Sequence, residues 1–222
     1  MKNNMFDLLT INDSGWYWPR NDGNGKLNQP GSCWHGLSVL TPDVPKQISE
    51  HVPEKKVVVQ AGGNCGFYVK QYAEIFDLVY TFEPDPLNFL CLAMNCRSAN
   101  VIKFQACLGF ERQGVSVGRW LADVGSCHVT GSGPIPTMQI DDLALERCDL
   151  IQLDVEGYEL NALKGAVSTI NKCKPVIAVE VYEDWAKRYN ASTAEVEQFL
   201  GGLGYKTAVT LENGDKIYKF SE

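Results

Sequence analysis

Short apolar runs alternate along this chain with segments of helical periodicity. Five runs rich in apolar and β-branched residues predict buried strands, at 57–61, 78–82, 101–107, 150–153 and 176–181. Three intervening segments place an apolar residue at every third or fourth position and predict helices, at 67–76, 86–94 and 160–170. Strands that alternate with helices are typical of βαβ units, so we expect a parallel sheet with helices on both faces.

Two further patterns extend this predicted sheet. Alternating runs at 205–211 and 216–220 flank Asn213 and Gly214, and Asn-Gly between alternating runs is a strong hairpin signal. Residues 109–140 alternate in short pieces with frequent glycine, which predicts a β-hairpin insertion after the third strand. We therefore expect a central, mostly parallel, seven-stranded sheet that carries an antiparallel C-terminal hairpin.

A glycine-rich turn, GGNCG at 62–66, follows the first predicted strand. The second strand ends in Glu83, about 20 residues further on, where a carboxylate can accept both hydrogen bonds of an adenosine ribose diol. Asn64 and Phe67 stand where a dinucleotide fingerprint has its second and third glycines, so a pyrophosphate would fit poorly. S-adenosylmethionine has a ribose and no phosphate, and the turn therefore favours it as the cofactor.

Composition and charge narrow the class of protein. The chain has 222 residues, is 45% hydrophobic and carries 27 acidic against 20 basic side chains, which argues against a non-specific nucleic-acid binder. No apolar run is long enough for a membrane span or a signal peptide, so we expect a cytoplasmic protein without a membrane partner. The eight cysteines form no C-x-x-C pair, and we interpret them as reduced core thiols rather than a metal or disulfide set.

Residues 1–50 differ from the rest of the chain and predict an irregular N-terminal cap on a domain that spans 51–222. This segment is rich in Gly, Pro, Asn and Asp, and it contains Trp16, Tyr17, Trp18, Trp34 and His35. The aromatic side chains either anchor the segment to the domain or form a stacking platform for a sugar or ring substrate, and we favour anchoring.

Several motifs together resemble one known family. QAGGNCG, FEPDP, IDDL, LDVEGYELNALKGA and VIAVEVY are similar to the motifs of the FkbM methyltransferases, over roughly residues 55–205. The resemblance implies a Rossmann-like class I methyltransferase fold and S-adenosylmethionine as cofactor. It also implies O-methylation of a hydroxyl acceptor on a sugar, glycan or small metabolite.

The resemblance and the predicted topology together assign candidate site residues. Ligands of open α/β sheets lie at the carboxyl ends of the strands, so Asp154 and Glu156 after the fourth strand are candidates for the general base. An alternative of about equal weight is that Asp154 caps the sheet edge and Glu156 the next helix. The cofactor is expected to contact Gln60, Gly62, Gly63, Asn64, Gly66, Glu83, Pro84, Ala106, Cys107 and Asp154.

Other side chains received weaker assignments. A metal held by Asp154, Glu156 and Glu180 is a less favoured alternative, and we expect no metal. His128, a lone histidine in the predicted insertion, is expected to be a surface or internally bonded residue rather than a base.

Two positions depart from the family pattern and keep other functions open. The family usually begins its glycine turn with Asp, where this chain has Gln60, and it usually has Lys ahead of its DVEG motif, where this chain has Gln152. These changes favour, as one alternative, a catalytically weak binding module that kept the fold. A second alternative is a nucleotide-dependent oxidoreductase built on a similar sheet.

Overall fold

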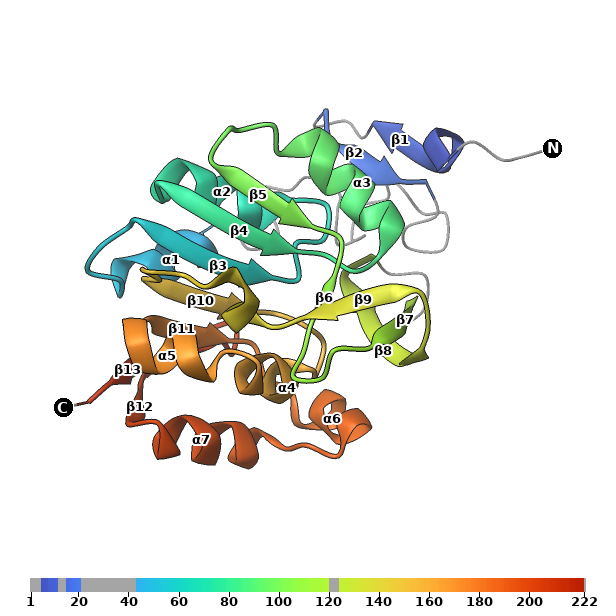
Figure 1. The fold of residues 1–222 in the computed structure, drawn as a ribbon. Helices are drawn as coiled ribbons and strands as arrows, with labels where there is room; N and C mark the ends of the chain where they lie inside the picture. The colour runs from blue at the N-terminus through green and yellow to red at the C-terminus, as the bar shows by residue number, and fades with distance from the viewer. Residues whose placement is uncertain (1–4, 12–14, 21–42, 120–123, 222) are drawn as a thin grey trace.

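The computed structural model describes residues 5–11, 15–20, 43–119 and 124–221, and it is built on one seven-stranded sheet (Figure 1). The strands are Val57–Ala61 (β3), Leu78–Phe82 (β4), Val101–Phe104 (β5), Leu150–Leu153 (β10), Val176–Val179 (β11), Tyr205–Thr210 (β12) and Lys216–Phe220 (β13). Their spatial order is β12-β13-β11-β10-β3-β4-β5. Only the two pairings of β13 within this sheet are antiparallel, which confirms the predicted fold class.

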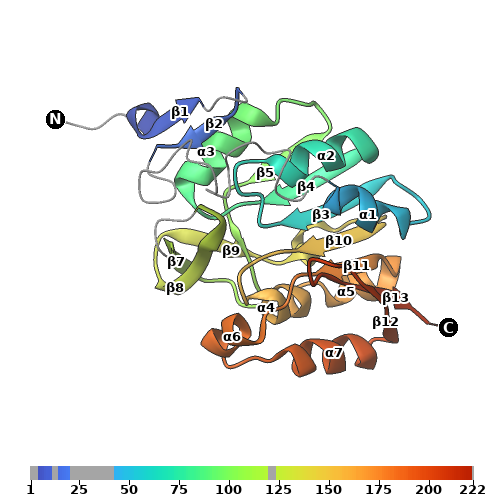
Figure 2. The ribbon, with the colours of Figure 1, turned by 180° about the vertical axis from the view of Figure 1, so that it is seen from behind.

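Helices cover both faces of the sheet, because neighbouring strand residues point to opposite sides. Val58 packs with the face that carries Val44–Glu50 (α1), Phe67–Ile75 (α2) and Pro86–Asn95 (α3), seen in front in Figure 2. Val59 and Ala61 pack with the opposite face, which carries Glu159–Lys164 (α4), Val167–Cys173 (α5) and Thr193–Gly202 (α7). The short helices Glu183–Ala186 (α6) and Lys187–Tyr189 (η5) follow β11.

Two helices begin at polar residues whose side chains cap them. Asp85 caps α3 by accepting hydrogen bonds from the backbone N–H groups of Leu87 and Asn88, and Pro86 occupies the first helical position. Ser192 caps α7 and accepts from the N–H of Glu195. Local sequence and fold therefore agree at both of these helix starts.

A second, four-stranded sheet forms the predicted insertion. Its strands are Cys107–Leu108 (β6), Gly114–Arg119 (β7), Cys127–Ser132 (β8) and Ile135–Met138 (β9), with a short 3-10 helix at Val124–Ser126 (η3) before β8. Figure 1 shows it beside the edge at which the parallel strands end. The prediction that the third strand reaches Cys107 was wrong, because β5 ends at Phe104. The N–H of Glu83, after β4, donates to the Phe104 carbonyl, and the next N–H on that side, of Asp85, donates instead to the Glu83 carboxylate, so the pairing stops there.

The helix predicted over 160–170 is in fact two helices. A Cβ on Gly165, between α4 and α5, would lie 2.6 Å from the carbonyl oxygen of Gly109, so the chain passes too close to another backbone for a side chain there. Asp141, in the 3-10 helix Ile140–Leu143 (η4), restarts the helix by accepting hydrogen bonds from the N–H groups of Ser168 and Thr169. A long-range contact that the local pattern does not contain therefore divides this segment.

The described parts of the N-terminal segment are held against the domain. They comprise Met5–Leu8 (η1), Leu9–Ile11 (β1), Tyr17–Pro19 (β2) and helix α1. Asn95 of α3 pairs with both backbone groups of Tyr17, and Trp18 is 1% exposed. These contacts hold the segment on the domain, while Trp34 and His35 lie outside the described residues. Helix α1 packs in the domain core through Val44 and Ile48.

Seven of the cysteines lie in the described ranges, and all seven are free thiols, most of them buried. In the same ranges, no helix is both long enough and apolar enough to cross a bilayer.

Removing the carboxylate of Asp141 tests the account of the broken helix. Its oxygens accept two backbone hydrogen bonds and one from the Thr169 hydroxyl. We expect Asp141→Ala to lower the free energy of unfolding by about 1–2 kcal/mol, as loss of a helix cap does. Asp77→Ala, which removes an exposed ion pair with Lys56, is the control and should cost about 0.5 kcal/mol or less. Urea unfolding followed by circular dichroism measures both, and equal losses would contradict this account.

Candidate active site

A cavity of about 220 Å³ opens at the carboxyl ends of β3, β4 and β10. Parallel sheets bind ligands at this edge. Most of the site residues predicted from sequence line it, namely Gly62, Gly63, Asn64, Glu83, Pro84, Ala106, Cys107, Asp154 and Glu156. The structure therefore brings together residues that are up to about ninety positions apart in the sequence.

The glycine turn passes so close to the neighbouring strands that side chains are excluded. Gly62 has φ +84°, and a Cβ there would lie 1.9 Å from the carbonyl oxygen of Asp154. A Cβ on Gly63 would lie 2.8 Å from the Thr81 hydroxyl. Both glycine N–H groups donate to the carbonyl oxygen of Phe82, so the turn is fixed to the tip of β4.

Glu83 is held by the backbone on both of its carboxylate oxygens. Oε2 accepts from the N–H of Asn64 at 2.7 Å, and Oε1 accepts from the N–H of Asp85 at 2.8 Å. The residue is 3% exposed, and this burial raises the pKa of Glu83 to about 7. Each carboxylate oxygen can accept a second hydrogen bond, so Glu83 can still bind a pair of hydroxyl groups in the cavity.

Asp154 lies in a group of carboxyl side chains. Burial, together with a hydrogen bond and repulsion from Glu180, raises the pKa of Asp154 well above its ordinary value. Glu156 adds to the repulsion. Asp154 therefore holds a proton more readily than an ordinary aspartate, and a cation beside it would lower its pKa again. Within the described residues, no group of three or more His, Cys, Asp or Glu side chains is arranged to hold a metal ion.

The turn after Asp154 has a strained backbone, and a nearby side chain holds it by hydrogen bonds. Glu156 has φ +58°, and Gly157 has φ +99° with no room for a Cβ, which would lie 2.4 Å from the carbonyl oxygen of Trp185. Glu159 supports this turn, because its Oε1 accepts from the N–H groups of Val155 and Gly157. Glu159, which sequence reasoning missed, thus holds this turn, while Glu156 lines the cavity.

Two predicted cofactor residues, Gln60 and Gly66, are not among those that line the cavity. The side chain of Gln60 points to the α2 face of the sheet, where it accepts a hydrogen bond from the Thr81 hydroxyl at 2.5 Å. Its register partner across β3 and β10 is Gln152. The two departures from the family pattern are therefore neighbours in the sheet. Gly66 begins α2, and a Cβ there would lie 2.6 Å from Sγ of Cys96 in the α2–α3 packing.

The insertion supplies a wall of the cavity that sequence reasoning missed. Val124, Gly125, Cys127, His128 and Val129 line it, together with Trp18 of β2. The sequence signals were only a lone histidine in an alternating run and an aromatic residue in an irregular segment. Neither signal contains the long-range contact that brings these residues to the cavity.

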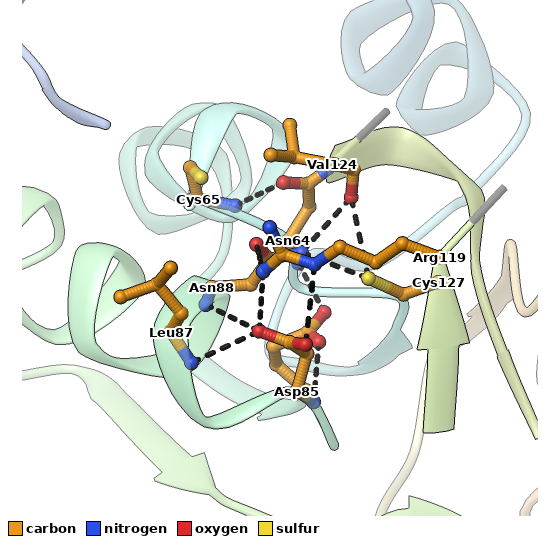
Figure 3. A network of polar contacts seen from close by, with 9 residues as sticks. Asn64, Cys65, Asp85, Leu87, Asn88, Arg119, Val124 and Cys127 are labelled. Atoms are coloured by element: carbon orange, nitrogen blue, oxygen red, sulfur yellow. Dashed lines mark hydrogen bonds and ion pairs between the residues drawn. The ribbon is translucent and has the colours of Figure 1, made fainter. Parts of the chain in front are cut away.

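Arg119 fastens the insertion to the start of α3 (Figure 3). Its guanidinium donates to Asp85 Oδ1 at 2.6 Å and to Asn88 Oδ1 at 2.8 Å, and the Arg119 and Asp85 side chains are 20% and 13% exposed. Asn88 in turn donates to the carbonyl oxygen of Val124 at 2.9 Å and to Sγ of Cys127. A partly buried ion pair thus ties the cavity wall to the residues that follow Glu83.

The strand order, the antiparallel β13 and the glycine turn define a Rossmann-like fold of the methyltransferase class. The family model described as the methyltransferase FkbM domain matches residues 60–207. The chain belongs to the FkbM methyltransferase family. The comparison with curated proteins gives no match.

Several solved structures are similar to the chain at low sequence identity. A methyltransferase FkbM from Methylobacillus flagellatus KT is 18% identical, with a TM-score of 0.48, over 83% of this chain and 55% of that one. A precorrin 8w decarboxylase from Methanobacterium thermoautotrophicum is 16% identical, with a TM-score of 0.49, over 81% of this chain and 90% of that one. A SAM dependent methyltransferase from Aquifex aeolicus is 14% identical, with a TM-score of 0.47, over 79% of this chain and 88% of that one. The chain thus spans about half of the FkbM structure, and the family assignment rests on the family model.

The buried carboxyl groups predict how stability depends on pH. The folded protein raises the pKa of Glu83 from 4.5 to about 7, of Glu159 from 4.5 to about 7, and of Asp215 from 3.8 to about 6. At a pH between the ordinary pKa and the raised pKa of such a group, the folded state binds more protons than the unfolded state. The free energy of unfolding therefore falls as pH rises.

We expect the melting temperature to fall by about 3 °C or more from pH 5 to pH 8. Glu83→Gln should make this fall smaller, and Glu74→Gln, on the exposed side of α2, should leave it unchanged. Differential scanning fluorimetry at constant ionic strength measures the melting temperature of each protein at each pH. A melting temperature that rises over this range, or an unchanged fall in Glu83→Gln, would contradict the assignment.

Proposed function

We propose that the protein is an S-adenosylmethionine-dependent O-methyltransferase whose acceptor is a hydroxyl group of a sugar, glycan or small metabolite. The observation that carries the proposal is the placement of Glu83. Its carboxylate is fixed by two backbone N–H groups at the wall of a cavity that also contains the glycine turn. That arrangement supports recognition of a ribose diol, and membership of the FkbM family supports methyl transfer.

The residues in the cavity fit such a cofactor. Glu83 would bind the ribose, the turn at Gly62 to Asn64 gives a backbone surface without bulky side chains, and Ala106 and Cys107 would lie against the adenine. Asp154 and Glu156 supply negative charge, which suits a cationic sulfonium and ammonium. When bound, the cofactor supplies an electrophilic methyl group. The chain's contribution is to hold the acceptor oxygen in line with it and to exclude water.

Two alternatives drawn from the sequence are less favoured. A catalytically weak binding module was considered because of Gln60 and Gln152, and neither of them lines the cavity. The family assignment favours a methyltransferase over a nucleotide-dependent oxidoreductase. The acceptor, a cytoplasmic location and the expectation of no nucleic-acid or membrane partner stay predictions.

Calorimetry with S-adenosylhomocysteine tests the proposal at its main contact. We expect binding by the wild type, and an affinity at least about 10-fold lower in Glu83→Ala, because two hydrogen bonds to a charged group are lost. Affinity should also fall below about pH 7, where Glu83 takes up a proton and one of its oxygens becomes a donor. Glu74→Ala is the matched control and should bind as the wild type does.

Transfer of a labelled methyl group to a panel of glycans and hydroxylated metabolites then tests the reaction. The absence of heat with S-adenosylhomocysteine in the wild type would overturn the cofactor. Equal affinities of the wild type and Glu83→Ala would overturn only the ribose assignment.

A further inference from the structure

Strand β8 of the insertion forms part of the cavity wall and is an edge strand. Cys127, His128 and Val129 of this strand line the cavity. The order of the four-stranded sheet is β6-β9-β7-β8, and within the described residues β8 pairs only with β7. An edge strand has backbone hydrogen bonds to a neighbouring strand on one side only. The position of this wall therefore depends on the side chains that hold β8 from outside the sheet.

Tyr189 holds β8 from a distant part of the chain. It is the last residue of η5, 60 positions from Val129, and its hydroxyl donates to the carbonyl oxygen of Val129 at 2.9 Å. The ring packs edge to face on Tyr158, with ring centres 4.8 Å apart and an angle of 78° between the planes. Tyr158 is only 9% exposed and belongs to an apolar cluster in the core. The ring is thus held by packing, and its hydroxyl fixes the strand at one point.

The segment that carries Tyr189 also lies directly against the turn after β10. A Cβ on Gly157, in that turn, would lie 2.4 Å from the carbonyl oxygen of Trp185 in α6. Val155, in the same turn, lines the cavity and packs on the same apolar cluster as Tyr189 and Val129. The segment from α6 to η5 therefore contacts both the turn after β10 and the wall formed by β8.

A second attachment of the insertion comes from the opposite flank of the cavity. Asn88 of α3 donates to the carbonyl oxygen of Val124 and to Sγ of Cys127 (Figure 3). Helix α3 follows β4, whereas η5 follows β11, and in the sheet β4 and β11 lie on opposite sides of β3 and β10. The Asn88 contact is thus on the flank of Glu83, where a ribose would bind. The Tyr189 contact is on the flank of the turn after β10.

We propose that Tyr189 is a positioning residue for the acceptor, an inference that rests on the proposed methyltransferase function. Its hydroxyl holds β8 at a fixed distance from the turn after β10 and so sets the width of the site where the acceptor binds. Methyl transfer needs the acceptor oxygen in line with the methyl carbon and the sulfur, and a displacement of about 1 Å can cost about 100-fold in rate. Tyr189 is not among the residues that line the cavity, so it acts through Val129.

Removal of the hydroxyl alone tests this role. Tyr189→Phe keeps the ring on Tyr158 and removes the hydrogen bond to Val129. With an acceptor identified in the panel, we expect kcat/KM for that acceptor to fall by about 10-fold or more. The KM for S-adenosylmethionine and the affinity for S-adenosylhomocysteine should change less than about twofold, because the contacts on the Glu83 flank are intact. A general loss of structure would instead impair the acceptor and the cofactor together.

Tyr205→Phe is the matched control. The Tyr205 hydroxyl also donates to a backbone carbonyl, that of Pro175, at 2.9 Å, and neither residue is among those that line the cavity. Pro175 precedes β11, at the edge of the sheet opposite to the cavity. We expect Tyr205→Phe to lower the melting temperature at least as much as Tyr189→Phe does, since Tyr205 is 3% exposed, and to leave kcat/KM for the acceptor within about twofold. Equal losses of kcat/KM in the two variants would overturn the proposal.

Hydrogen exchange of the full chain, followed by mass spectrometry, gives a readout that needs no acceptor. We expect the backbone N–H groups of residues 127–132 to exchange about fivefold faster or more in Tyr189→Phe than in the wild type, and at the wild-type rate in Tyr205→Phe. Unchanged exchange of β8 in Tyr189→Phe would overturn the proposal. Wild-type kcat/KM in Tyr189→Phe would also overturn it while methyl transfer itself stands. A wild type that binds no S-adenosylhomocysteine would instead overturn the proposed function.

Discussion

The hydrogen bond from the N–H of Asn64 to the Glu83 carboxylate is the contact on which the shape of the site depends. It joins the turn after β3 to the residue after β4, so the two strand tips cannot separate without breaking it. The close approach of Gly62 to the Asp154 carbonyl fixes the same turn to β10. Three neighbouring parallel strands are thereby closed around one cavity. Glycine is required where backbones meet, and a carboxylate is required where two N–H groups converge.

A second constraint positions the insertion, which supplies the other side of the cavity. Arg119 neutralises Asp85 at the start of α3, and Asn88 relays the contact to Val124 and Cys127 (Figure 3). The ion pair is only partly exposed, so it is screened less by salt than a surface pair. The turn after β10 and the wall formed by the insertion thus each have support from side chains outside them.

Local patterns predict most of the sheet but not the contacts between distant segments. The apolar runs, the glycine turn and Glu83 all carry local signals, and the structure places them as expected. The strand end at Phe104 depends on Asp85, whose N–H donates to the Glu83 carboxylate instead of to β5, and the helix break at Gly165 depends on the Gly109 carbonyl. The same limit explains the site. Gln60 was assigned to the cofactor from its place in a motif, but strand alternation turns its side chain toward Thr81. Trp18 and His128 reach the cavity only through tertiary packing that periodicity does not encode.

A crystal structure of the chain with S-adenosylhomocysteine tests the central claim most directly. The account predicts that both ribose hydroxyls donate to the carboxylate of Glu83, with the sulfur between the acidic turn after β10 and the insertion wall. A nucleoside bound elsewhere on the protein, or a ribose that makes no hydrogen bond to Glu83, would contradict it.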